Sequence, residues 1–321
     1  MAPPVASEDR IFLALESGTL AAHSITDGKQ LWSIEMKVEQ PMAFADGRLF
    51  ATTSDTIAAI NADDGKDVWR VPGEALTAPV LVRSGWLIAA TKGRLTALHA
   101  ADGGKVWSRD MGSVTHRPTI DGELLFVPVE DGRLVALALQ TGQTLWDEPV
   151  ASSPTEPLGY GDRLYFGSDS KEFHCFKSAR GEHDWSREVG ARVIGEATAD
   201  GEHVYFTAMN NIVYALDRVS GNQRWKKDLA FRPLSGPVLF GQHLALGGLA
   251  TEVPGFDHKT GKPTGKLTLG EPVGAAPAFI PSLNGAPAIV VLTVSAKQEW
   301  KLSLAGPPAP KPAGDAKGAG S

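Results

Sequence analysis

An acidic run is the first candidate for chemistry in this 321-residue chain. The segment Asn61-Ala62-Asp63-Asp64-Gly65 carries carboxylate and amide oxygens, which are the ligands that calcium takes. A calcium loop also needs a particular carboxylate spacing and a distant glutamate, and this segment lacks both. The same residues coincide with a turn that recurs along the chain. The sequence therefore predicts a turn here and no metal site.

The histidines and the one cysteine are weaker candidates. The eight histidines, among them His23, His99 and His183, are scattered without the spacing of metal ligands. Cys175 occupies a position that small residues fill in the other repeats, so we expect a buried thiol. The chain contains no nucleophile elbow, no zinc-binding His-Glu motif and no phosphate-binding glycine loop. We therefore expect no catalytic residue, no cofactor and no metal ligand.

Seven recurring cassettes predict the elements that position these side chains. Each cassette has a glycine four residues before its last position, and that last residue is tryptophan in six of the seven. Successive last positions lie 37–40 residues apart, which indicates a repeat architecture. The last residues are Trp32, Trp69, Trp107, Trp146, Trp185 and Trp225, with Gly265 in the seventh cassette.

Each repeat contains four short apolar runs that are typical of strands. Runs such as RLYFGSD and HVYFTAM are rich in β-branched and aromatic residues, and pairs such as Asp121-Gly122 supply tight turns. Four antiparallel strands in about 39 residues make a propeller blade. An eighth unit (APAFI, AIVVLTV and EWKLSL) lacks the cassette and shows three clear strands. We expect an all-β, eight-bladed propeller of four-stranded blades, with seven blades as the alternative.

Composition and the two ends of the chain set wider limits. The net charge of −6 gives no support for nucleic-acid binding, and no apolar stretch reaches the length of a membrane span. We expect one domain over residues 1–305 and a disordered Pro/Ala/Gly-rich tail or linker over 306–321. No signal peptide is visible at the start, so the chain is either cytoplasmic or trimmed of a leader that could have carried a lipid anchor.

The cassettes resemble the repeat of the pyrroloquinoline quinone (PQQ)-like β-propeller family. Ala215-Leu216-Asp217, followed by Gly221 and Trp225, matches that repeat best, and Thr260-Gly261-Lys262 matches its turn. The resemblance covers residues 3–305. It implies that each cassette tryptophan docks against the glycine-containing turn of the next blade. We therefore assign all six tryptophans to structural docking.

The family resemblance implies three functional readings. Quinoprotein alcohol dehydrogenases of the family have an adjacent Cys-Cys disulfide, a calcium site and a catalytic aspartate, and none of these can be carried over to this chain. Short, BamB-like members are non-catalytic scaffolds of outer-membrane β-barrel assembly, which implies protein partners in an envelope complex and a periplasmic or envelope location. A ligand-sensing propeller of a bacterial signalling protein is the alternative, and a PQQ-dependent dehydrogenase is the third reading.

The loops that join successive blades are expected to gather at one mouth of the channel, where loops on a rigid scaffold commonly carry function. Arginine clusters bind carboxylates, so Arg117, Arg192 and Arg232 could bind an acidic peptide of a partner. The other interpretation is that each arginine pairs with a neighbouring glutamate. The side chains expected near the common axis are Glu39, Glu74, His116, Arg117, Arg192, Glu196 and Arg232.

Overall fold

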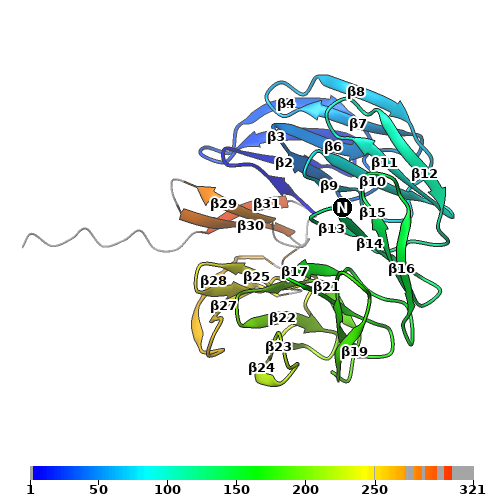
Figure 1. The fold of residues 1–321 in the computed structure, drawn as a ribbon. Coiled ribbons are helices and arrows are strands. Elements are labelled where there is room, and N and C mark those ends of the chain that lie inside the picture. The colour runs from blue at the N-terminus through cyan, green and yellow to red at the C-terminus, as the bar shows by residue number, and fades with distance from the viewer. Residues whose placement is uncertain are drawn as a thin grey trace, which may run out of the picture.

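The strands of the chain are arranged as a ring of antiparallel sheets. The computed structural model describes residues 3–248, 250–271, 273, 278–283, 286–294 and 300–305. Within these residues, seven sheets have four strands and one has three, and each sheet uses strands that are consecutive in the chain. The sheets follow one another around the ring (Figure 1). The predicted all-β propeller of four-stranded blades is confirmed. The described residues form seven complete blades, which is the alternative to the expected eight, because the eighth sheet has three strands. The predicted tail at 306–321 lies outside the described residues.

The blades are numbered in chain order, and the first four make up the N-terminal half of the ring. Their strands are β1 (Val5–Ala6), β2 (Arg10–Ala14), β3 (Thr19–Ser24) and β4 (Gln30–Glu35) in blade 1; β5 (Ala43–Ala45), β6 (Arg48–Thr52), β7 (Thr56–Asn61) and β8 (Asp67–Pro72) in blade 2; β9 (Leu81–Arg83), β10 (Trp86–Thr91), β11 (Arg94–His99) and β12 (Lys105–Asp110) in blade 3; and β13 (Thr119–Asp121), β14 (Leu124–Val129), β15 (Arg133–Ala138) and β16 (Thr144–Pro149) in blade 4.

The remaining sheets are blades 5 to 7 and a three-stranded sheet that we call sheet 8. Their strands are β17 (Leu158–Tyr160), β18 (Arg163–Gly167), β19 (Glu172–Lys177) and β20 (His183–Glu188) in blade 5; β21 (Val193–Ala199), β22 (His203–Ala208), β23 (Ile212–Asp217) and β24 (Gln223–Asp228) in blade 6; β25 (Val238–Phe240), β26 (His243–Ala245), β27 (Glu252–Asp257) and β28 (Pro263–Thr268) in blade 7; and β29 (Ala278–Leu283), β30 (Ala286–Val294) and β31 (Trp300–Ala305) in sheet 8.

Sheet 8 closes the ring between blade 7 and blade 1. It lies between β25–β28 and β2–β3 in Figure 1. On one side Val291 packs in a buried cluster with Val253 of blade 7, and on the other side Val290 packs with Ile11 of blade 1. The eighth unit therefore has the three strands that its sequence shows, and it completes the circle through apolar contacts.

In five of the first six blades, a large, a small and a second large side chain lie side by side on the second, third and fourth strands. In blade 1, Phe12, Ala22 and Trp32 lie directly opposite one another on three adjacent strands. Residues opposite each other in antiparallel strands share a face, so the small residue leaves room for the phenyl ring to approach the indole, with 5.9 Å between ring centroids. The small cassette residue therefore acts as a spacer. Equivalent ring pairs are Phe50–Trp69, Phe126–Trp146, Tyr165–Trp185 and Tyr205–Trp225.

Each cassette tryptophan also contacts the next blade. Trp107 lies so close to Gly142 that a Cβ atom on this glycine would be 2.8 Å from the indole. The indole Nε1–H donates to the carbonyl oxygen of Leu139 at 2.8 Å. Gly142 also has a φ of 68°, which favours glycine. The same contact joins Trp32–Gly65, Trp69–Gly103, Trp146–Gly181, Trp185–Gly221 and Trp225–Gly261. The six contacts link blades 1 to 7 in series.

The first strand of each sheet lies at the inside of the ring. β1 contacts both β5 and β29, and further contacts join β5 to β9, β13 to β17, β17 to β21 and β21 to β25. Because the strands of a blade alternate in direction, the loops between blades emerge at the same end of the ring as the loops between the second and third strands. We call this end the channel mouth.

Candidate functional site

An ion pair at the channel mouth joins blades that are not neighbours. Arg117 precedes β13 of blade 4, and Glu196 lies in β21 of blade 6. Arg117 Nη2 is 2.9 Å from Glu196 Oε2. The pairing of β21 with β22 is irregular between Ile194 and Thr198, and this bulge takes Glu196 out of the regular ladder. The two side chains are 37% and 34% exposed, so the pair is accessible to a ligand.

A second polar contact connects the same two loops. Arg192 Nη2 lies 3.0 Å from His116 Nε2, and Arg192 Nε lies 3.1 Å from Asp169 Oδ1. Because arginine only donates, His116 Nε2 accepts this hydrogen bond and the imidazole is neutral. Burial and the charge of Arg192 lower the pKa of His116, against the opposite effect of the carboxylates of Glu156, Asp169 and Glu130. The geometry and the pKa therefore agree on a neutral ring.

Glu196 carries a partly buried carboxylate at the mouth. Burial raises the pKa of this carboxyl, and Glu156 acts in the same direction, whereas Arg117 and Arg83 lower it. Arg117 thus stabilises a carboxylate that the protein itself supplies. A carboxylate from a partner would have to compete with Glu196 for the guanidinium.

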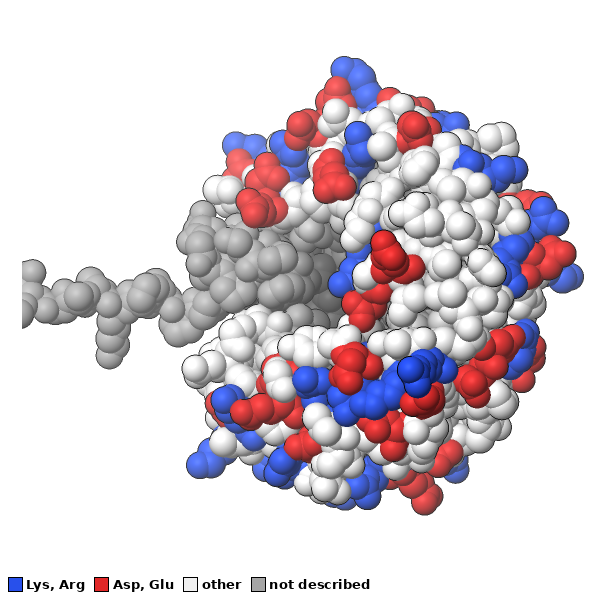
Figure 2. All heavy atoms as spheres, in the orientation of Figure 1, with Lys and Arg blue, Asp and Glu red and all other residues white. Residues whose placement is uncertain are grey.

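A cavity of about 310 Å³ opens beside Arg117, inside the first strands of blades 1 to 3. Its walls include the side chains of Val5, Phe44 and Val82, and Arg117 is the one charged residue among those that line it. Figure 2 shows basic and acidic side chains together at the centre of the ring, with further charges of both signs around its rim. The mouth is therefore a surface of mixed charge.

Three of the side chains expected at the axis lie apart from these contacts. Arg232 is exposed and has no carboxylate partner among the described residues. Glu39 lines a pocket with Lys37, and Glu74 lines a groove between blades 2 and 3. Glu74 is not at the axis because it follows the outer strand β8 by two residues, whereas Arg117 lies just before an inner strand.

The structure also brings in residues that the sequence reasoning missed. Asp169 lies between β18 and β19, and Glu130 lies between β14 and β15. Both positions belong to loops between second and third strands, which reach the same mouth as the loops between blades. This propeller geometry is the signal that could have identified them.

A buried serine–histidine contact has no route for a substrate. Ser168 Oγ lies 2.9 Å from His174 Nε2, and both residues are buried. Burial lowers the pKa of His174 to about 4 and raises the pKa of the Cys175 thiol to about 12. These side chains are neutral at pH 7, and we assign them to packing. The buried thiol is what the sequence predicted for Cys175.

The acidic run of blade 2 forms a turn, as predicted. Asn61 Oδ1 accepts the backbone N–H of Asp63 at 2.7 Å, and Asp64 pairs with Lys66 at 2.8 Å. Across the described part of the chain, no group of three His, Cys, Asp or Glu side chains is arranged to hold a metal ion. The same residues include no helix that is long and apolar enough to span a membrane.

Comparison with known families identifies the repeat. Residues 16–158 and 153–305 each match the family described as outer membrane protein assembly factor BamB. The chain belongs to this family. The predicted PQQ-like, BamB-like repeat is therefore confirmed over nearly the whole propeller. No curated protein sequence matches the chain significantly.

Solved structures support the same fold at low sequence identity. BamB from Moraxella catarrhalis is 19% identical with a TM-score of 0.74, over 94% of this chain and 93% of that chain. The computationally designed Ika8 protein is 14% identical with a TM-score of 0.76, over 94% and 95% of the two chains. Quinohemoprotein alcohol dehydrogenase from Comamonas testosteroni is 12% identical with a TM-score of 0.73, over 91% and 70%. Since the fold is shared by an assembly factor, a design and an enzyme, function must come from the site.

Proposed function

We propose that this chain is a non-catalytic, protein-binding scaffold of the cell envelope, which acts in the periplasm or at the membrane surface. The observation that carries the proposal is the family match, because it covers most of the chain and names an assembly factor. The proposed binding face is the channel mouth, with His116, Arg117, Arg192 and Glu196, and with Arg232 as a separate exposed cation.

The polar contacts of the mouth support a binding role. Arg117 and Arg192 are held in place by Glu196 and Asp169, yet about a third to a half of each arginine side chain is exposed. Prearranged arginines lose less conformational freedom on binding than mobile ones, which favours recognition of an acidic peptide. The buried Ser168–His174 contact and the buried thiol of Cys175 give no comparable support for catalysis.

The test is affinity purification of the tagged full chain from the native cell envelope, followed by mass spectrometry. We expect the wild-type chain to recover a defined envelope partner, and the double variant Arg117→Glu/Arg192→Glu to lose it. The matched control is Arg180→Glu, because Arg180 is 79% exposed and lies in a turn between third and fourth strands, at the other end of the ring. Recovery of no partner by any form would contradict the scaffold proposal.

A second candidate, a ligand-sensing propeller, is favoured by the cavity beside Arg117. A cavity in which one guanidinium lies beside apolar side chains suits a small carboxylate that has an apolar body. A thermal-shift screen of such carboxylates against the wild-type chain and Arg117→Ala tests this candidate. Stabilisation of the wild-type chain alone would support it, and no shift with any compound would contradict it.

A further inference from the structure

One position of the repeat is filled by an apolar side chain in every blade from 1 to 7 except blade 2. This position lies four residues after the end of the cassette, and its backbone N–H donates to a loop between second and third strands in each of the seven blades. We call it the plug position. Its occupants are Met36, Gly73, Met111, Val150, Val189, Leu229 and Leu269.

Gly73 leaves the plug position of blade 2 empty. Its N–H donates to the carbonyl oxygen of Asp55 at 2.8 Å, as the N–H of Met36 donates to Gly18 at 2.8 Å, so the two backbones are equivalent. In blade 1 the Met36 side chain is 4% exposed and packs with Ala51 and other buried residues of blade 2. Blade 2 offers no such side chain to blade 3.

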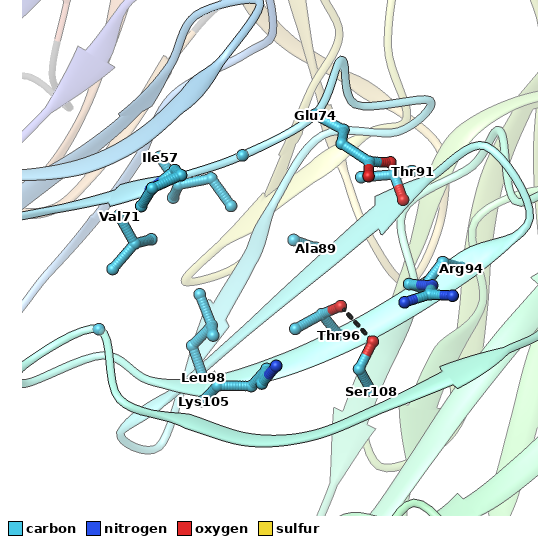
Figure 3. A pocket seen from close by; sticks show the side chains of 13 residues that line it. Ile57, Val71, Glu74, Ala89, Thr91, Arg94, Thr96, Leu98, Lys105 and Ser108 are labelled. Carbon is cyan, nitrogen blue, oxygen red and sulfur yellow. Dashed lines mark hydrogen bonds between the residues drawn. The ribbon is translucent and has the colours of Figure 1, made fainter.

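The empty position opens into a groove of about 490 Å³ between blades 2 and 3. Its apolar walls are formed by Ile57 and Val71 on the blade 2 side and by Ala89 and Leu98 on the blade 3 side (Figure 3). A volume of this size is in the range of ligand-binding pockets and exceeds that of one missing side chain.

Small side chains on blade 3 widen the same groove. Ala89 and Thr96 face blade 2, and larger side chains occupy the equivalent positions of the next three blades. Those larger pairs are Val127 and Val135 in blade 4, Phe166 and His174 in blade 5, and Phe206 and Tyr214 in blade 6. The equivalent pair of blade 2, Ala51 and Ala58, is also small, but there Met36 belongs to the same buried cluster, so the missing side chain at position 73 is the feature that leaves this groove open.

Backbone conformation does not require glycine at position 73. Gly73 is not among the residues with positive φ, and a Cβ atom placed on it would meet only Ile57 Cγ1 closely, at 3.2 Å. A larger side chain could thus occupy this position, as methionine does in blades 1 and 3. The chain keeps an apolar groove exposed where its own repeat supplies a means of filling it.

The polar rim of the groove defines the chemistry of an occupant. Lys105 is exposed and has no carboxylate within ion-pair distance among the described residues. Beside it, Thr96 Oγ1 and Ser108 Oγ lie 2.9 Å apart, and Glu74 lies at the far end of the groove (Figure 3). An apolar centre beside an unpaired ammonium group suits an apolar side chain that is adjacent to a carboxylate.

We propose that this groove binds an extended segment of a partner protein, with one large apolar side chain at the plug position and a neighbouring Asp or Glu on Lys105. The proposal rests on the proposed scaffold function. A protein segment is favoured because Pro72, Glu74, Arg94 and Lys105 are exposed along the rim, so the groove is open along its length. The chain's own residues 306–321 contain no large apolar side chain that could fill it.

The experiment is a selection of random linear peptides displayed on phage against the purified, full-length chain. We expect enriched peptides to share one large apolar residue next to Asp or Glu. Their affinity for Gly73→Met is expected to fall by at least about tenfold, as for the loss of one hot-spot contact. Lys105→Glu is expected to remove the preference for the acidic residue and keep the apolar one.

The matched control for Gly73→Met is Gly201→Met. Gly201 also lacks a positive φ, and no described atom beyond its two chain neighbours lies within 4 Å of the place that its Cβ would take. Melting temperatures of all variants establish that they are folded. Enriched peptides that bind Gly73→Met as tightly as wild type would overturn the proposal, and so would the absence of any enriched peptide. If dodecyl maltoside binds at the groove and no peptide is enriched, the groove binds an alkyl chain. This outcome would also overturn the proposal.

The same variants separate this proposal from the scaffold function. If Gly73→Met recovers the envelope partner as wild type does, the scaffold function stands and the groove proposal fails for that partner. If peptides select the groove while no bait recovers an envelope partner, the groove proposal stands and the envelope scaffold fails. The peptide selection decides the groove by itself, because it needs no native partner.

Discussion

At the scale of single residues, a cassette tryptophan and its receiving glycine depend on each other. Gly142 adopts a φ that disfavours other residues and also lacks the Cβ that would collide with the indole of Trp107. The indole in turn has a hydrogen-bond partner for its N–H in the turn that Gly142 completes. Neither residue can be exchanged without loss of the contact between two blades.

We expect Trp107→Ala to lower the free energy of unfolding by about 3–5 kcal/mol, because it removes a large packed side chain. Urea unfolding followed by circular dichroism measures the change. The control is Val106→Ala, whose side chain is 37% exposed and whose effect should lie within about 0.5 kcal/mol. A melting temperature that Trp107→Ala leaves unchanged would contradict the docking role.

Comparison of Gly142→Ala with Gly28→Ala separates the two reasons for glycine in the turn, which are its positive φ and its close contact with the indole. Gly28 has a φ of 72° and no described atom near its Cβ position, so its substitution carries only the conformational cost. Gly142→Ala adds the collision with Trp107, and we expect it to be more destabilising than Gly28→Ala by at least about 1 kcal/mol. Equal losses in urea unfolding would show that the indole does not need a bare glycine.

Acid should weaken the turn that Asp217 organises. Partial burial raises the pKa of Asp217, but hydrogen bonds from the Ser220 backbone and Arg224 outweigh it and hold this pKa well below its ordinary value. Such a group contributes stability above the unfolded pKa of about 3.9, and this contribution is lost as the pH falls below it. We expect Asp217→Asn to lose less stability than wild type between about pH 5 and pH 3 in urea unfolding.

The control for this pH dependence is Asp228→Asn, since Asp228 is exposed and forms no hydrogen bond or ion pair with another described side chain. This variant should follow the wild-type curve. If Asp217→Asn and wild type have the same stability difference between the two pH values, the carboxylate of Asp217 does not contribute to the acid sensitivity.

At the scale of elements, the two junctions of sheet 8, with blade 7 and with blade 1, show no tryptophan docking among the side chains that the structure describes, and we call them together the seam. The contacts from Trp32 to Gly65 and onward end with Trp225 on Gly261, because blade 7 carries Gly265 in place of the next tryptophan. Among the side chains that the structure describes, none beyond its two chain neighbours lies within 4 Å of the place that a Cβ on Gly28 of blade 1 would take. Sheet 8 has apolar contacts on both sides, such as that of Val290 with Ile11. This seam should open first.

Native-state hydrogen exchange tests the seam. We expect backbone amides of β30 to exchange through opening events of lower free energy than those of β15, which lies between two docked tryptophans in blade 4. Mass spectrometry of exchanged fragments at several urea concentrations measures both. Equal protection of the two strands would show that the apolar contacts close the ring as firmly as the tryptophans do.

Much of the fold could be predicted from the sequence, because the sequence pattern of one blade recurs seven times. The cassettes identify the third and fourth strands, and the small residue that pairs with each tryptophan, such as Ala22 with Trp32, shows its role once the register is known. The eighth unit shows three runs, and the structure contains three strands there. Gly73 was also visible in the sequence, as one glycine among six apolar residues four positions after the cassettes.

At the scale of the whole molecule, the candidate site depends on geometry that no local pattern contains. Arg117 and Glu196 are 79 residues apart, and they meet only because the ring curves and because a bulge redirects β21. Loop position alone also placed Glu74 at the axis, although it lies on the outer groove. The sequence could name the loops that reach the mouth, but which side chains touch follows from closure of the ring.

The direction of the tryptophan contacts has a consequence for folding during synthesis. Each cassette indole finds its carbonyl partner 30–33 residues further along the chain. At 5–20 residues per second, every such tryptophan waits about 2–7 s on the ribosome for the turn that covers it. During synthesis, the most recently completed blade therefore has an exposed cassette indole. The turn of the next blade covers this indole once that blade has folded. The seventh cassette carries Gly265 in place of tryptophan, so it presents no indole for a later sheet to cover.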